Sequence, residues 1–101
     1  MEIKSDLKGN TLTIYLEGEL DHFAASRLRN AIDNLLLDSC AKSVVFDMSH
    51  LEFMDSTGIG LLIGRYKMMS AEGVECFIKN PRPSVAKILN LSGIFSIIKL
   101  I

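Results

Sequence analysis

The sequence predicts a single α/β domain built on a mixed β-sheet with helices, in the order β-β-α-β-α-β-α-β. Apolar residues alternate with polar ones near the start of the chain and later recur every three or four residues. In the later part strands and helices take turns, which implies parallel strands joined by right-handed crossovers. The chain has 101 residues, 49% hydrophobic and 23% charged, which is typical of one globular domain spanning residues 1–101.

The first element is a predicted β-hairpin made of residues 3–7 and 11–17. Lys8-Gly9-Asn10 supplies the turn between the two strands. The second strand alternates cleanly, so one of its faces should be buried. Its apolar positions are Leu12, Ile14 and Leu16.

A first helix is predicted from about Asp21 to Asp38, after Gly18-Glu19-Leu20. The apolar spacing changes here from two to three and four, which indicates a helix. The residues that carry this spacing are Leu28, Ala31, Ile32 and Leu35. Asp21 is a suitable N-cap because its carboxylate can accept from amides of the first turn.

Residues 43–48 are short and rich in β-branched and aromatic side chains, which indicates a central strand. A loop is expected over residues 49–54. Capping side chains at 55–58 then begin a second helix that runs to about Ala71.

Gly60 and Gly64 lie four residues apart on this second helix. Glycine in a helix costs about 1 kcal/mol relative to alanine, so the pair predicts that the helix backbone packs closely on the sheet there. Leu61, Arg65 and Met68 are expected on its outward, solvated face.

The rest of the chain predicts a strand at 74–79, a break at 80–84 and a short helix over 84–91. Ser92-Gly93 ends that helix, and residues 97–101 predict a last strand.

Charge and hydropathy exclude several classes of function. The net charge is −1 and there is no basic block, which argues against nucleic acid as a direct partner. No apolar run approaches the roughly 18 residues that span a bilayer, and the first residues are charged and alternating, so we expect no membrane span and a cytoplasmic protein. Cys40 and Cys76 stand alone, which predicts no metal site and no disulfide, with both thiols buried.

Enzymatic motifs are weak, so we expect neither catalysis nor a cofactor. His22 and His50 are the only histidines, and no Gly-x-Ser-x-Gly turn presents a serine nucleophile. Gly58-Ile59-Gly60 opens a helix as a dinucleotide-binding fingerprint would. However, Ile63 occupies the position where that fingerprint requires its third glycine, and the chain has no phosphate-loop lysine motif. Nucleotide binding at this helix start is therefore a minor alternative.

Residues 51–60 hold the densest pattern in the chain. Asp55 and Ser56 suit helix capping, which by itself accounts for them. Phe53 and Met54 are large apolar residues in the predicted loop, and their expected partial exposure beside a hydroxyl indicates a docking patch.

Four segments form a recognisable pattern in order along the chain. They read Gly18-Glu19-Leu20-Asp21-His22, Phe53-Met54-Asp55-Ser56-Thr57-Gly58-Ile59-Gly60, Gly64-Arg65-Tyr66-Lys67 and Leu91-Ser92-Gly93-Ile94-Phe95. In these segments the chain resembles the STAS domain of the anti-sigma factor antagonists, most closely the sporulation type. The resemblance covers almost the whole chain and implies the STAS fold.

The resemblance implies a regulatory binding module. Proteins of this family bind an anti-sigma factor that is also a serine kinase and thereby release the sigma factor. The kinase phosphorylates one serine of the antagonist, which switches it off, and a serine phosphatase restores it. In this sequence the matching acceptor is Ser56.

The same resemblance implies roles for the residues around the acceptor. Asp21 matches a position beside the acceptor that matters for kinase recognition, and Asp55 matches the residue before it. Thr57 is the weaker acceptor candidate. The expected partner surface comprises Asp21, His22, Phe53, Met54, Asp55, Ser56, Thr57 and Gly58. A phosphate on Ser56 should be tolerated by the fold, because free first-turn amides and the helix dipole favour an anion.

Two questions stay open from the sequence. One alternative keeps the STAS fold as a scaffold subunit of a larger signalling or membrane-associated complex, without phospho-switching. The family usually carries another helix after the last strand, whereas this sequence stops at Leu100-Ile101. The oligomeric state therefore stays open between a monomer and a weak dimer.

Overall fold

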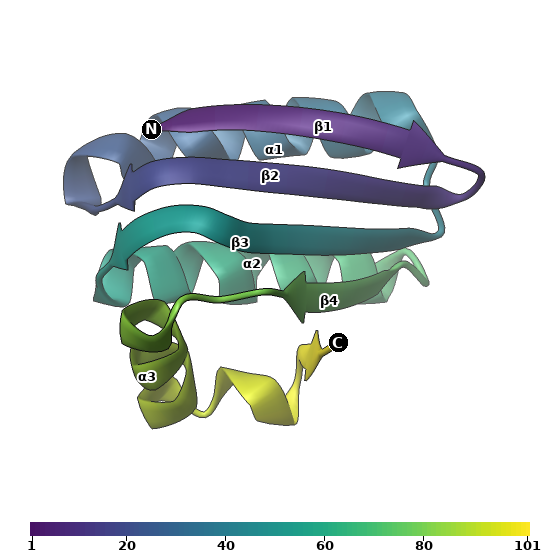
Figure 1. Cartoon of the computed structure of the whole chain (residues 1–101). Coiled ribbons are helices and arrows are strands. Elements are labelled where there is room, and N and C mark those ends of the chain that lie inside the picture. Colours follow the sequence, from purple (N-terminus) through teal and green to yellow (C-terminus); the bar gives the residue numbers. More distant parts are fainter.

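A five-stranded sheet runs through the molecule in the order β1-β2-β3-β4-β5 (Figure 1). The computed structural model describes residues 1–101. β1 is antiparallel to β2, and the other neighbours are parallel, so the predicted mixed sheet and element order are confirmed. The strands are β1 (Glu2–Lys8), β2 (Thr11–Leu20), β3 (Ser43–Met54), β4 (Glu75–Lys79) and β5 (Lys99–Leu100).

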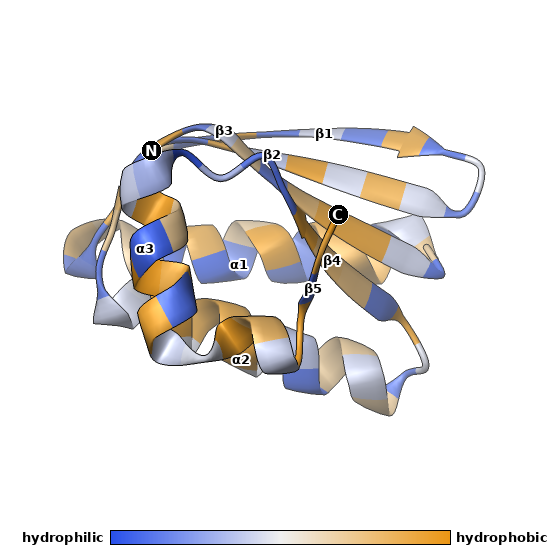
Figure 2. Ribbon diagram, turned by 60° about the horizontal axis from the view of Figure 1, so that its bottom comes forward, coloured by the Kyte–Doolittle hydropathy of each residue, from blue (hydrophilic) through white to orange (hydrophobic).

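The two long helices cover the same face of the sheet. Figure 2 shows α1 (His22–Ser39) and α2 (Ser56–Ala71) on one side of the strands. The shorter α3 (Pro83–Ser92) contacts β3 and stands at one end of the sheet, and a 3-10 turn, η1 (Ile94–Ser96), leads from it to β5.

The core lies between the sheet and the helices. The alternation predicted for β2 is confirmed, because Leu12, Ile14 and Leu16 are all buried. On α1 the helical spacing delivers Leu28 and Ile32 to the same core. Complete burial of such a side chain contributes about 1.5–3 kcal/mol to stability, so this two-layer core holds the fold together.

β2 and β3 are longer than the sequence predicts. The predicted second strand ends too early, since β2 continues from residue 17 to Leu20. The predicted loop at 49–54 is wrong, since β3 continues to Met54. Register shifts between Tyr15 and Glu17 and again at Gly18 break the alternation that would have revealed these strands. A bulge of this kind inserts a residue and bends the strand without ending it. At the other end of the chain, the predicted strand at 97–101 contracts to Lys99–Leu100.

Three predictions about individual side chains are wrong. Leu61 and Arg65 are 8% and 9% exposed, so only Met68 of the predicted outward face is at the surface. Cys40 is exposed and ends α1 with a left-handed backbone, φ 52°, whereas Cys76 is buried as predicted.

The glycines of α2 also differ from expectation. A Cβ at Gly60 or Gly64 would meet no atom within 4 Å, so neither residue marks close packing on the sheet. Gly58 is the packed glycine, because a Cβ there would lie 2.7 Å from Met54 Cγ and 2.9 Å from Leu20 Cγ. This contact lets the start of α2 lie directly against the ends of β2 and β3.

Candidate functional site

The two long helices begin side by side at one edge of the sheet. Leu20 and Met54, the last residues of the parallel strands β2 and β3, are register partners. The residue that follows each of these strands is an aspartate, Asp21 after β2 and Asp55 after β3. The Asp55 amide donates a hydrogen bond to the Leu20 carbonyl at 3.3 Å. Asp21 and Asp55, far apart in the sequence, therefore flank one site at the carboxyl edge of the sheet. Figure 1 shows β2 and β3 ending next to each other at this edge.

Both aspartates cap their helices. Oδ1 of Asp21 accepts from the Ala24 amide at 2.9 Å, which confirms the predicted N-cap. Oδ1 of Asp55 accepts from the amides of Thr57 at 2.9 Å and Gly58 at 3.2 Å. The capping of α2 is thus performed by Asp55.

Ser56 occupies the first position of α2 and is exposed. Because Asp55 satisfies the amides that a serine cap would bind, the Ser56 hydroxyl is not needed to hold the helix start. An exposed hydroxyl on a rigid helix start can be approached by the active site of another protein.

The expected apolar patch is smaller than the sequence predicts. Phe53 is 45% exposed, whereas Met54 is fully buried beneath Gly58. The predicted loop over 49–54 is in fact strand, and in it Leu51 and Met54 are buried whereas Glu52 and Phe53 are exposed. Met54 and Gly58 therefore support the site from below.

Sequence reasoning missed one exposed aromatic residue at this edge. Phe23, in the first turn of α1, is 89% exposed, and its ring meets the edge of the exposed His22 ring at 5.8 Å between centroids. The signal was present: counting back three or four residues from Leu28 reaches Ala25 and Ala24, so Phe23 falls outside the core-facing positions.

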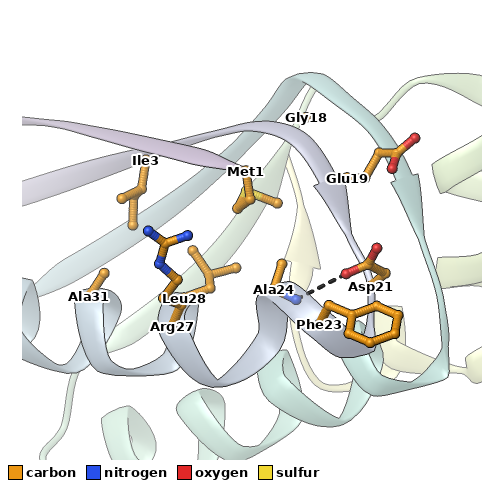
Figure 3. Close-up of a pocket in the computed structure, with 10 residues that line it drawn as sticks. All are labelled: Met1, Ile3, Gly18, Glu19, Asp21, Phe23, Ala24, Arg27, Leu28 and Ala31. Atoms are coloured by element: carbon orange, nitrogen blue, oxygen red, sulfur yellow. Dashed lines mark hydrogen bonds between the residues drawn. The ribbon is translucent and has the colours of Figure 1, made fainter.

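A cavity of about 570 Å³ opens beside Asp21, between α1, the first residues of β1 and the last residues of β2. Figure 3 shows the Asp21 carboxylate hydrogen-bonded to Ala24, with Phe23 next to it. Glu19, Arg27 and Met1, which carries the terminal amino group, also line this cavity. Nowhere in the chain do three metal-ligating side chains gather closely enough to hold an ion.

The site carries uncompensated negative charge. The ion pairs of the chain join Lys4 to Glu17, Lys8 to Asp6 and Arg65 to Asp33. Neither Asp21 nor Asp55 is paired with a cation. The expectation of free first-turn amides at α2 is wrong for Thr57 and Gly58, whose amides are already bound to Asp55.

Comparison with known proteins gives this site its family. The STAS domain family model matches residues 2–101. The chain belongs to the STAS domain family. The predicted family and fold are thereby confirmed, and the helices of the chain are too short or too polar to cross a membrane.

Curated relatives of this STAS domain include proteins named anti-sigma factor antagonists. An anti-sigma F factor antagonist of Paenibacillus polymyxa is 31% identical over 100 residues, covering 99% of this chain and 86% of that protein. The unphosphorylated form of the anti-sigma factor antagonist SpoIIAA superimposes with a TM-score of 0.83 at 29% identity, covering 99% of this chain and 88% of that one. The phosphorylated form of SpoIIAA from Bacillus gives 0.74 at 28% identity, with 99% and 91% covered.

Proposed function

We propose that this STAS domain is a phospho-regulated anti-sigma factor antagonist. It binds an anti-sigma factor that is also a serine kinase, releases the sigma factor, and is switched off when that kinase phosphorylates Ser56. A serine phosphatase restores the active form. The protein acts in the cytoplasm, as a monomer or weak dimer, without contacting nucleic acid itself.

The observation that carries this proposal is the division of labour between Asp55 and Ser56. Asp55 caps α2 through two amide hydrogen bonds, and Ser56 stays exposed beside it. A structural role in capping therefore does not account for the serine. A role toward a partner does, and relatives that share about 30% of the sequence are anti-sigma factor antagonists.

The chemical step is a phosphoryl transfer within the kinase. Oγ of Ser56 attacks the γ-phosphorus of ATP, forming the Oγ–P bond while the bond to the departing ADP oxygen breaks. The hydroxyl proton passes to a base of the kinase. This chain contributes the nucleophile, and Asp21 and Asp55 are the charges by which the kinase recognises it.

Phosphorylation adds a charge of about −1.5 to −2 beside two unpaired carboxylates. Within this chain, the positive end of the α2 dipole offsets the repulsion from Asp21 and Asp55, so the fold persists. A carboxylate of the partner within about 5 Å would be repelled by one to several kcal/mol at a surface dielectric, and each 1.4 kcal/mol is tenfold in affinity. Binding is thus switched off without an internal rearrangement. That SpoIIAA exists in a phosphorylated form of similar fold supports this mechanism.

The surface around Ser56 supplies the remaining contacts. Phe53, His22 and Thr57 are exposed or half-buried around the hydroxyl, and we assign them to the partner interface. The exposed Phe23 extends this surface along the start of α1.

The test compares what wild type, Ser56→Ala and Ser56→Asp retain from lysate of the native organism, with each retained protein identified by mass spectrometry. We expect wild type and Ser56→Ala to retain an anti-sigma factor serine kinase and Ser56→Asp to lose it. Ser84→Asp is the matched control, because Ser84 is an exposed serine in the first turn of α3. Equal retention by all four proteins would contradict the switch and favour the scaffold alternative.

A further inference from the structure

A second surface feature lies next to the proposed phosphorylation site. A groove of about 490 Å³ separates α1 from α2. It begins at Thr57, the neighbour of Ser56, and continues along α2 past Gly60 and Gly64. Ala25 and Arg29 of α1 form part of the opposite wall.

The two glycines of this groove have no explanation within the fold. Both lie inside α2, where glycine costs about 1 kcal/mol relative to alanine. A Cβ at either position would meet no atom within 4 Å, so an alanine would fit. Gly58 differs, because there the space is filled by Leu20 and Met54. No contact within the chain therefore requires glycine rather than alanine at Gly60 or Gly64.

The lining of the groove also carries positive charge on arginine and contains no carboxylate. Its charged or ionisable lining residues are His22, Arg29 and Arg65, and no acidic residue lines it. The Arg65 side chain is only 9% exposed. Its Nε lies 3.1 Å from Oδ1 of Asp33, an ion pair without the geometry of a hydrogen bond. Its Nη2 donates a hydrogen bond to the sulfur of Met68 at 3.3 Å. Asp33 offsets the charge of Arg65, whereas Arg29 is unpaired and exposed.

We propose that this groove docks an acidic segment of the anti-sigma factor. The backbone of that segment passes over Gly60 and Gly64, where the missing side chains allow close approach, and its carboxylates face Arg29 and His22. The groove starts one residue from Ser56, so a single partner can cover both. This inference rests on the proposed function and names the part of the partner that lies beside the serine.

The first test fills the groove. The serine kinase retained by wild type in the capture experiment is purified, and its dissociation constant is measured for Gly60→Leu and Gly64→Leu. We expect at least a tenfold weaker affinity. Ser70→Leu is the control, since Ser70 is an exposed position of α2 outside the groove and should leave affinity within twofold.

The second test reverses charge and separates binding from folding. Arg29→Glu should weaken kinase binding at least tenfold, whereas Lys87→Glu, an exposed lysine of α3, should not. Gly60→Ala and Gly64→Ala should raise the unfolding temperature, which shows that the glycines do not serve the fold.

The outcomes distinguish this inference from the proposed function. If the leucine variants and Arg29→Glu bind the kinase as tightly as wild type while Ser56→Asp does not, the function stands and the groove is not its docking site. If the leucine variants instead abolish self-association measured by sedimentation and leave kinase affinity unchanged, a second copy occupies the groove and the inference is overturned. If wild type retains no anti-sigma factor, the proposed function fails first.

Discussion

Gly58 and Gly60 lie two residues apart on the same helix, yet their surroundings are opposite. Gly58 faces the sheet, where Leu20 and Met54 leave no room for a Cβ, and Gly60 faces an open groove between helices. A glycine-rich helix start can therefore combine two environments. One face of α2 is packed against the sheet, and the other borders an open groove.

The thiols show the same contrast between the interior and the surface. Cys76 lies on β4 in the core beneath the helices, and burial raises its pKa from the ordinary value of 9.0 to about 12. Cys40 lies at the surface, at the end of α1. This division between a packed interior and an open surface can be tested by chemical modification and by substitution.

The largest effect is expected in thiol reactivity. The raised pKa leaves Cys76 with roughly a thousandfold less thiolate than an ordinary cysteine near neutral pH, and burial blocks access as well. Treatment of the folded protein with iodoacetamide at pH 8 should therefore modify Cys40 and spare Cys76, as read by peptide mass spectrometry. In denaturant both should react. Equal rates in the folded protein would show that the core beneath α2 is not closed.

The same thiol predicts an alkaline loss of stability. Because the pKa of Cys76 is higher in the folded state than in the unfolded chain, folding retains a proton that the unfolded chain releases. The stabilising contribution is complete below pH 9 and is lost as the pH rises from 9 toward 12. Urea unfolding at successive pH values should show this decline, and Cys76→Ala should reduce its slope.

The next effect concerns the packed face of α2. Gly58→Ala forces a methyl group against Leu20 and Met54 and should destabilise the protein by about 1–3 kcal/mol, as overpacking does. The measurement is the urea midpoint at constant m-value. In a Leu20→Ala background the same Gly58→Ala change should cost less, because the smaller side chain makes room for the methyl group. An unchanged midpoint for Gly58→Ala would contradict the close contact.

The two helix caps should differ in their contribution. Asp55→Ala removes the partner of two amides and should cost about 1–2 kcal/mol, whereas Asp21→Ala removes one bond and should cost about 1 kcal/mol or less. Asp55→Asn preserves the capping oxygen and is the control. A larger loss of stability for Asp21→Ala than for Asp55→Ala would show that the number of capping hydrogen bonds does not set the contribution of each aspartate.

The smallest effect is expected on the open face. Gly64→Ala should stabilise the fold by about 0.5–1 kcal/mol, because helix propensity improves and no atom opposes the new methyl group. The measurement is the unfolding temperature of Gly64→Ala compared with that of Gly58→Ala. The same substitution on one helix should raise the unfolding temperature at Gly64 and lower it at Gly58. Destabilisation by Gly64→Ala would remove the argument that the fold has no use for this glycine.

Local patterns in the sequence were enough to predict the order of the elements, the core face of β2 and the N-cap at Asp21. These features depend on spacing within a segment and on the hydrogen-bonding chemistry of one side chain, both of which are local. The motif around Ser56 also indicated the family, through its resemblance to the STAS domain of the anti-sigma factor antagonists.

The contacts and burial of the residues at this site depend on the tertiary structure. β3 reaches Met54 because β2 pairs with it past two irregularities in register, and that pairing turns Met54 inward. The adjacency of Asp21 and Asp55, and the opposite surroundings of Gly58 and Gly60, likewise depend on which distant segments meet. Burial and contact are properties of neighbours that are remote in the chain, so local patterns cannot contain them.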